Sequence, residues 1–422
     1  MTAYLRLVRN PVFGRLWVGA TVSIFGDALT FVSLVWLTTE LGGGAAEIGI
    51  LAACLTAPVI VGGMAAGVLL DRFDRRRLLM ADNLVRGLAV LSVPIAAWAG
   101  VLGQAQLYAV AAVYGLLYMV SLAGFPSVIP DIVDEDDLPT ANALESLAFG
   151  LGGVVGPTAA GLLIAVIGAA NNLLADAFTY FFFVAVLATV RLPAHASVAP
   201  SGGPRPSVGL GPALRFVRRT PAVLAITLMF MAFNVGEGML TVLLPIFARD
   251  TLGLDAAGYG ALVSAFTAGT LVGAVIVGAV RWRWTLGRSI AAAQLAAGVA
   301  ILGLATTPPF VGAVAVLVIV GLFASPLTIW AQTIRMRLIP EALRGRVFSL
   351  LRTLMRSTPP AGGLLAGGLL AAGLAIGPVV ALLAAVVAVP GAIALAHPAL
   401  SAAETGDRSS RVAQTAAEPP AA

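Results

Sequence analysis

The sequence has few charged residues and no lysine. Of its 422 residues, 11% are charged and 59% are hydrophobic, whereas a soluble globular domain carries about 25% charged residues. Apolar runs of about twenty residues recur along the chain, and a helix of that length crosses a bilayer core about 30 Å thick. We therefore expect an all-α membrane protein that is surrounded by the lipid bilayer.

The missing lysine and the scarcity of histidine and cysteine exclude several classes of protein. A phosphate-binding loop for ATP needs a lysine, and every basic residue here is arginine. The two histidines, His195 and His397, lie outside the apolar runs, and Cys54 is the only cysteine. A disulfide within the chain and a cysteine-based metal cluster are therefore excluded. We expect neither an ATP-driven pump nor an enzyme, and we expect no metal and no cofactor.

Polar breaks divide the apolar sequence into segments that predict twelve transmembrane helices. The segments cover residues 14–39, 47–70, 78–100, 105–130, 141–167, 173–190, 221–247, 257–280, 289–307, 310–333, 347–372 and 376–396. The stretch 191–220 is polar and rich in Pro, Gly and Ser, so we interpret it as a cytoplasmic linker. We expect two six-helix bundles, 1–190 and 221–396, followed by a disordered cytoplasmic tail at 397–422.

Arginine is concentrated in alternate breaks, and this pattern predicts the orientation of the chain. The clustered residues are Arg6, Arg9, Arg15, Arg72, Arg75, Arg76, Arg77, Arg191, Arg205, Arg215, Arg218, Arg219, Arg281, Arg283, Arg288, Arg335, Arg337, Arg344 and Arg346. Loops rich in arginine stay on the cytoplasmic side of a membrane. We therefore expect a multi-pass protein of the bacterial plasma (inner) membrane with both termini in the cytoplasm, and we expect no nucleic acid partner.

The two halves resemble each other. Leu-Arg-Leu-Val-Arg-Asn-Pro at residues 5–11 is similar to Leu-Arg-Phe-Val-Arg-Arg-Thr-Pro at 214–221, and each precedes the first helix of its half. The same offset, carried forward, places Asp27 and Glu237 at one depth. Pseudo-symmetric bundles with a substrate site between them are a known transporter architecture.

Ionisable side chains within the apolar segments are candidates for proton coupling. Charged groups in a membrane helix are costly and usually face a cavity. Asp27, Arg86 and Glu237 lie in such segments, Asn234 shares a helix face with Glu237, and Glu145 is near the start of the fifth helix. Alternatively, Asp27 and Arg86 only form an ion pair, or the acids cap kinks at neighbouring glycines. Glu145 could also be stabilised by its helix N-terminus without any function.

The second break resembles the loop signature of the major facilitator superfamily, Gly-x-Leu-x-Asp-Arg-x-Gly-Arg-Arg/Lys. The matching residues are Gly67, Leu69, Asp71, Arg72, Arg75 and Arg76. Asp74 replaces the usual glycine. The resemblance implies a major facilitator fold and a gating loop, in which Asp71 would meet the start of the eleventh helix near Arg346. The alternative is that these arginines only set the topology.

The fifth helix is similar to the antiporter motif Gly-x-x-x-Gly-Pro-x-x-Gly-Gly of exporters in this superfamily. Gly152, Gly156, Pro157 and Gly161 match, and Ala160 replaces a glycine. Such glycines also occur where helices simply pack closely. The region from Val128 through residue 144 is similar to the branch that contains macrolide-efflux and enterobactin-exporter proteins.

Together these resemblances imply a secondary active transporter that works as a monomer by alternating access. It would export amphipathic small molecules such as drugs, macrolides or siderophores in exchange for protons. The fourth helix lacks the arginine that many proton-coupled members carry, so proton coupling is a hypothesis in which Arg86 substitutes. The alternative function is a non-transporting receptor or assembly scaffold, because a fold does not determine a function.

Overall fold

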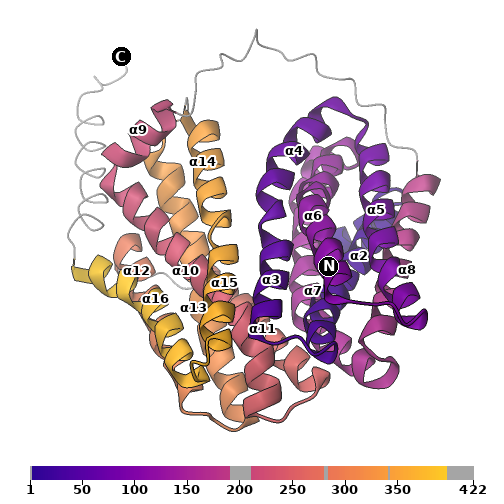
Figure 1. The fold of residues 1–422 in the computed structure, drawn as a ribbon. Helices are drawn as coiled ribbons and strands as arrows, with labels where there is room; N and C mark the ends of the chain where they lie inside the picture. Colours follow the sequence, from indigo (N-terminus) through magenta and orange to yellow (C-terminus); the bar gives the residue numbers. More distant parts are fainter. Residues whose placement is uncertain (1, 191–210, 280–283, 341–342, 397–422) are drawn as a thin grey trace, which may run out of the picture.

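The computed structural model describes residues 2–190, 211–279, 284–340 and 343–396, and these residues form helices and no strand. Eleven of the described helices are long and apolar enough to cross a membrane. Figure 1 shows the helices before residue 190 and those after residue 211 as two groups that lie side by side. The expected all-α membrane protein is confirmed.

We call the two sets of helices the N-terminal group and the C-terminal group. The N-terminal group contains α1 (Thr2–Val8), α2 (Phe13–Glu40), α3 (Ala45–Thr56), α4 (Pro58–Arg72), α5 (Arg75–Trp98), α6 (Gln104–Ile132), η1 (Glu135–Asp137), α7 (Leu138–Ile167) and α8 (Ala169–Thr189). The C-terminal group contains α9 (Gly211–Arg219), α10 (Pro221–Ile246), η2 (Phe247–Thr251), α11 (Ala256–Ala279), α12 (Leu286–Ala305), α13 (Phe310–Leu338), α14 (Arg344–Arg356), α15 (Pro359–Ala371) and α16 (Ile376–Ala396). The linker end of the molecule is the one where α8 ends and α9 begins, and the far end is opposite.

Two of the expected helices are interrupted at prolines. The segment predicted at 47–70 consists of α3 and α4, which meet at Pro58, and the segment predicted at 347–372 consists of α14 and α15. A proline cannot donate a backbone hydrogen bond, so Pro359 leaves the Met355 carbonyl without its helical partner. The Asn234 side-chain amide (2.7 Å) and the Thr358 hydroxyl (2.8 Å) donate to that carbonyl instead.

The C-terminal part of the expected linker contains a helix. Helix α9 (Gly211–Arg219) buries Ala213 and Val217 against Val347 and Leu351 of α14. Its apolar residues recur at helical spacing, which explains why a polar and arginine-rich stretch still forms a helix. Residues 191–210 and the predicted tail at 397–422 lie outside the described residues.

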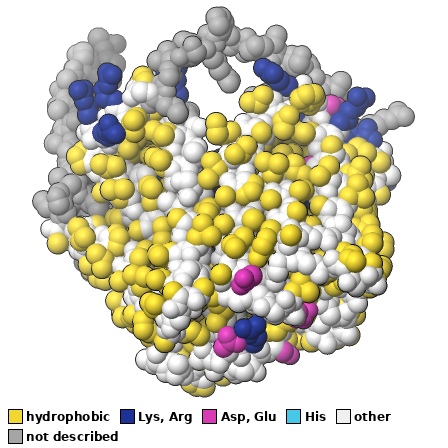
Figure 2. All heavy atoms as spheres, in the orientation of Figure 1, with side chains coloured by type: hydrophobic (Ala, Val, Ile, Leu, Met, Phe, Trp, Pro, Cys, Tyr) yellow, Lys and Arg dark blue, Asp and Glu magenta, His cyan; other side chains and the backbone are white. Residues whose placement is uncertain are grey.

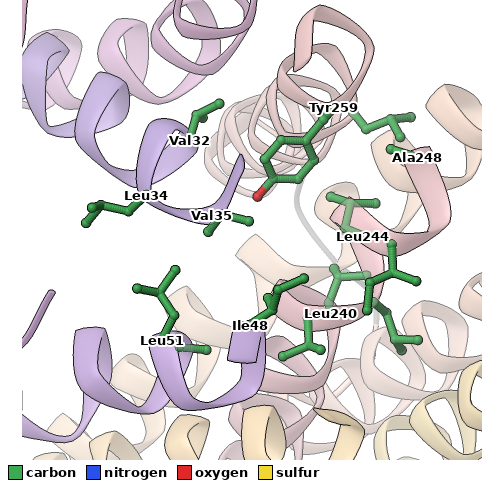
Figure 3. Close-up of a cluster of buried hydrophobic side chains, with 14 of the residues drawn as sticks. Val32, Leu34, Val35, Ile48, Leu51, Leu240, Leu244, Ala248 and Tyr259 are labelled. Carbon is green, nitrogen blue, oxygen red and sulfur yellow. The ribbon is translucent and has the colours of Figure 1, made fainter. Parts of the chain in front are cut away.

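The hydrophobic core joins the two groups only towards the far end. There, Val35 of α2 and Ile48 of α3 belong to one cluster with Leu244 of α10 and Tyr259 of α11 (Figure 3). The buried clusters at the linker end each contain residues of one group alone. Figure 2 shows a broad hydrophobic surface, with most of the visible arginines at the linker end.

Small residues bring helices of the two groups into backbone contact at the far end. A Cβ atom added to Gly260 of α11 would lie 2.1 Å from the Pro157 carbonyl oxygen of α7, and one on Gly161 would lie 2.3 Å from the Ala256 carbonyl oxygen. Helices α3 and α15 meet in the same way, at Gly49. These two helix crossings join the groups at the far end of the molecule.

Gly260→Ala is expected to loosen the contact between α7 and α11. The added methyl group clashes with a backbone oxygen, and overpacking of this kind costs about 1–3 kcal/mol. The Ser264 hydroxyl, which lies in the same crossing, is hydrogen-bonded to Thr158 (2.8 Å) and buried. In a Cys54→Ala background, Ser264→Cys should therefore react with a thiol reagent several times faster when Gly260→Ala is also present.

Gly278→Ala is the matched control for this prediction. Gly278 is on the same helix, but an added Cβ would meet no atom within 4 Å. The reaction of Ser264→Cys should be unchanged in that variant. The account of close packing would be contradicted if Ser264→Cys reacted at the same rate alone, with Gly260→Ala and with Gly278→Ala.

Candidate functional site

A buried arginine organises the polar residues inside the N-terminal group. Arg86 lies near the middle of α5, and its side chain has no exposed area. One terminal nitrogen, Nη1, donates to Asp27 of α2 (3.0 Å) and to the Tyr180 hydroxyl of α8 (3.3 Å). The guanidinium also lies 4.6 Å from the centroid of the Tyr180 ring. Burial of a charge in a membrane protein requires such compensating partners.

The other terminal nitrogen of Arg86 binds a second carboxylate. Nη2 donates to Asp82, one turn earlier on α5, at 2.8 Å, and it also contacts the Ser121 hydroxyl of α6. Ser121 in turn donates to Asp82 (2.6 Å). The Asp82 side chain is 1% exposed. Arg86 and Asp82 therefore form a closed, fully buried ion pair.

Asp27 is the more open of the two carboxylates. Its side chain is 18% exposed, it accepts a hydrogen bond from Tyr180 (2.6 Å), and it lines a small cavity of about 30 Å³. Glu145 of α7 and Tyr118 of α6 line the same cavity. The expected pairing of Asp27 with Arg86 is therefore present, and it leaves Asp27 in reach of the cavity.

A third carboxylate of the N-terminal group, that of Asp176, lies on α8 one helical turn before Tyr180. Asp176 accepts hydrogen bonds from the Thr30 and Thr179 hydroxyls, and it is fully buried. An added Cβ on Gly26 would lie 2.0 Å from an Asp176 oxygen. The glycine next to Asp27 therefore makes room for Asp176.

The polar residues predicted in the C-terminal group, Glu237 and Asn234, do not form a buried ion-pair network like that of Arg86. Glu237 of α10 has an exposed side chain, and no described side chain forms an ion pair with it. The positive charge of Arg356 acts on its carboxyl from the end of α14. Asn234 does not join Glu237 in a shared polar network, because its amide is bound to the Met355 carbonyl at the break between α14 and α15.

Two arginines of the predicted gating loop bind other helices of the N-terminal group at the linker end. Arg75 forms an ion pair with Asp131 of α6 (3.0 Å), and Arg76 donates to the carbonyls of Leu187 (2.6 Å) and Ala188 (2.8 Å) in α8. Gly67 lies on α4 with no atom within 4 Å of an added Cβ, and Arg72 is exposed at the end of that helix. The side chain of Asp71 lies outside the described part of the structure. Arg346 is partly exposed near the start of α14.

The residues of the predicted antiporter motif contact helices in both groups. An added Cβ on Gly152 would lie 2.9 Å from the Ile24 side chain, and one on Gly156 would lie 2.5 Å from Ala28, both on α2. Pro157 and Gly161 face α11 at the crossing described above. Helix α7 therefore connects the helix that carries Asp27 with the C-terminal group.

Sequence analysis missed Asp82 and Asp176. Asp82 precedes Arg86 by four residues, a spacing that places both side chains on one helix face, so their pairing could have been predicted. Asp176 lies in an apolar segment, which is itself a signal of function or of a buried partner. Within the described residues, no cluster of His, Cys, Asp or Glu could hold a metal ion.

Curated proteins with related sequences are exporters. The chain is 28% identical over 371 residues to the multidrug efflux pump Tap of Mycolicibacterium fortuitum, a match that covers 85% of this chain and 88% of that protein. It is 23% identical over 345 residues to the enterobactin exporter EntS of Salmonella typhimurium, with 82% of each chain covered.

Solved structures share the fold at low sequence identity. The crystal structure of the nucleoside transporter NupG superimposes with a TM-score of 0.72 at 12% identity, covering 94% of this chain and 99% of NupG. The family model described as transmembrane secretion effector matches residues 2–420. The chain therefore belongs to the transmembrane secretion effector family of major facilitator transporters.

Proposed function

We propose that the protein exports amphipathic small molecules in exchange for protons. Export itself is supported by the related multidrug efflux pump and enterobactin exporter. The observation that supports the proton step is the difference in exposure between the two carboxylates that bind Arg86. The side chain of Asp82 is buried, whereas that of Asp27 borders a cavity. Only a carboxylate that water can reach can take up and release a proton during transport.

In this proposal Asp27 is the group that exchanges a proton. When it is ionised, Arg86 and Tyr180 hold it in place through hydrogen bonds. When it is protonated, Asp82 still neutralises Arg86, so the buried guanidinium is never left without a counter-ion. This arrangement lets the charge of Asp27 change at a small cost in the low-dielectric interior. Glu145, which lines the same cavity, would pass protons between Asp27 and water.

The proposed transport cycle needs two bundles that open to alternate sides of the membrane. We count α14 and α15 as one interrupted helix, which gives twelve transmembrane helices in two six-helix bundles. From the arginines at the linker end we infer that the protein lies in a bacterial plasma membrane, with that end and both termini on the cytoplasmic side. With this orientation the far-end crossings would close the external side, and the molecule would be in an inward-facing state. When the cytoplasmic side closes, Asp71 would contact the start of α14 near Arg346. We propose a monomer as the working unit.

Asp27→Asn is expected to abolish proton-coupled transport while the protein still folds and inserts. The asparagine preserves the shape and accepts the Tyr180 hydrogen bond, but it cannot carry a proton. Uptake of a panel of anionic and cationic amphipathic dyes into inside-out vesicles, with and without an imposed proton gradient, measures this loss. Gradient-dependent uptake by wild-type protein establishes a transporter.

Asp136→Asn, which removes an exposed carboxylate in η1, is the control for surface charge. It should transport as the wild type does. Gradient-driven uptake in Asp27→Asn equal to that of Asp136→Asn would defeat the role of Asp27. Absence of uptake in wild-type vesicles for every dye would favour a non-transporting scaffold.

Arg86→Gln is expected to destabilise the protein because it leaves Asp82 buried without a cation. Removing one partner of a buried ion pair costs about 3–5 kcal/mol. The thermal unfolding midpoint in detergent should fall clearly below that of wild type. The double variant Arg86→Gln/Asp82→Asn removes both charges and should regain most of this loss. Identical midpoints for the single and double variants would show that the pair is not the source of the stability.

A further inference from the structure

A second cavity lies between the two groups at the linker end, and its two walls differ in character. It has a volume of about 310 Å³ and is bounded by α4 and α6 on one side and by α14 on the other. The wall from the N-terminal group includes Ile60, Met64 and Met119, whereas Arg352 and Arg356 project from α14. A solute that fills this space therefore meets apolar side chains on one face and guanidinium groups on the other.

Among the residues that the structure describes, no carboxylate forms an ion pair with either arginine of this cavity. Both side chains are exposed. They are four residues apart on one helix, so they lie on the same face and repel each other. An anion bound between them would remove this repulsion and form charge-assisted hydrogen bonds with both.

Membrane topology does not explain Arg356. It is twelve residues after the first residue of α14, which at 1.5 Å per residue is about 18 Å along the helix. This depth is well beyond the cytoplasmic boundary, where arginines set orientation. A charged residue at membrane depth that faces a cavity is a candidate for contact with a solute.

The surroundings of the arginine pair are also positive. Arg335 of α13 is buried directly behind it, with Nη2 3.3 Å from the Met355 sulfur and the guanidinium 5.0 Å from the centroid of the Phe230 ring. No described carboxylate forms an ion pair with Arg335. The nearby acid is Glu237, whose carboxyl feels the charge of Arg356. Among the described residues on this side of the cavity, Arg335, Arg352 and Arg356 therefore outnumber the single carboxylate, Glu237.

We propose that this cavity is the cytoplasmic binding site for substrate, and that the substrate class is amphipathic anions. Arg352 and Arg356 bind the anionic group, and Ile60, Met64 and Met119 cover the apolar body. The inference rests on the proposed export function. It separates the two tasks in space, because proton exchange belongs to Asp27 in the N-terminal group and substrate charge is recognised by α14.

Two fluorescent probes with the same apolar body and opposite charges test this proposal. Pyrenebutyrate and pyrenebutylammonium are titrated into full-length protein in phosphatidylcholine nanodiscs, and binding to empty nanodiscs is subtracted. We expect wild type to bind pyrenebutyrate more tightly. Arg352→Gln and Arg356→Gln should each weaken that binding about tenfold, the loss of one hydrogen bond to a charged group.

Three further variants separate recognition from folding. Arg352→Lys keeps the positive charge and should retain most of the affinity, whereas Met64→Asn should weaken both probes alike. Arg337→Gln removes an exposed arginine of α13 that does not line the cavity and should change nothing. Equal affinity for the two probes, or unchanged pyrenebutyrate binding in both glutamine variants, would overturn the proposal. No proton gradient is involved, so either result is independent of the role of Asp27.

Discussion

The guanidinium of Arg86, buried at the middle of a membrane helix, is the charge around which the N-terminal group is built. Its partners come from four helices: Asp27 from α2, Asp82 from its own α5, Ser121 from α6 and Tyr180 from α8. A buried cation without these partners would be very costly. The same bonds that compensate Arg86 therefore fix how these helices pack, and they bring one carboxylate to the edge of a cavity while sealing the other.

The two groups contact each other through glycines and apolar side chains rather than through ion pairs. At the far end, glycines of α7, α11, α3 and α15 let backbones touch, and one hydrophobic cluster spans both groups. At the linker end each group has its own buried clusters, and a cavity lies between parts of α4 and α14. Helix α7 takes part in both arrangements, since Gly156 packs on α2 near Asp27 and Gly161 packs on α11. Helix α7 therefore links the helix that carries Asp27 to the contact between the groups.

Hydropathy predicted most of the helices, because a bilayer imposes a similar length and polarity on every spanning segment. It did not predict the break at Pro58 or the amphipathic helix α9. It also did not predict the break at Pro359, where the Asn234 side chain replaces a lost backbone hydrogen bond. The pairing of Asp27 with Arg86 was one of the alternatives considered from the sequence. Asp176 was not predicted because its partners are the hydroxyls of Thr30 and Thr179 rather than a cation. The cavity-facing Arg356 was not predicted because it is one of many arginines.

The central claim is that Asp27 exchanges a proton whereas Asp82 remains a fixed counter-ion of Arg86. Infrared difference spectra between acidic and neutral samples of the purified protein report directly on carboxyl groups that gain or lose a proton. The account predicts a carboxyl signal in wild type that disappears in Asp27→Asn and persists in Asp82→Asn. A signal that survives in Asp27→Asn and is lost in Asp82→Asn would contradict it.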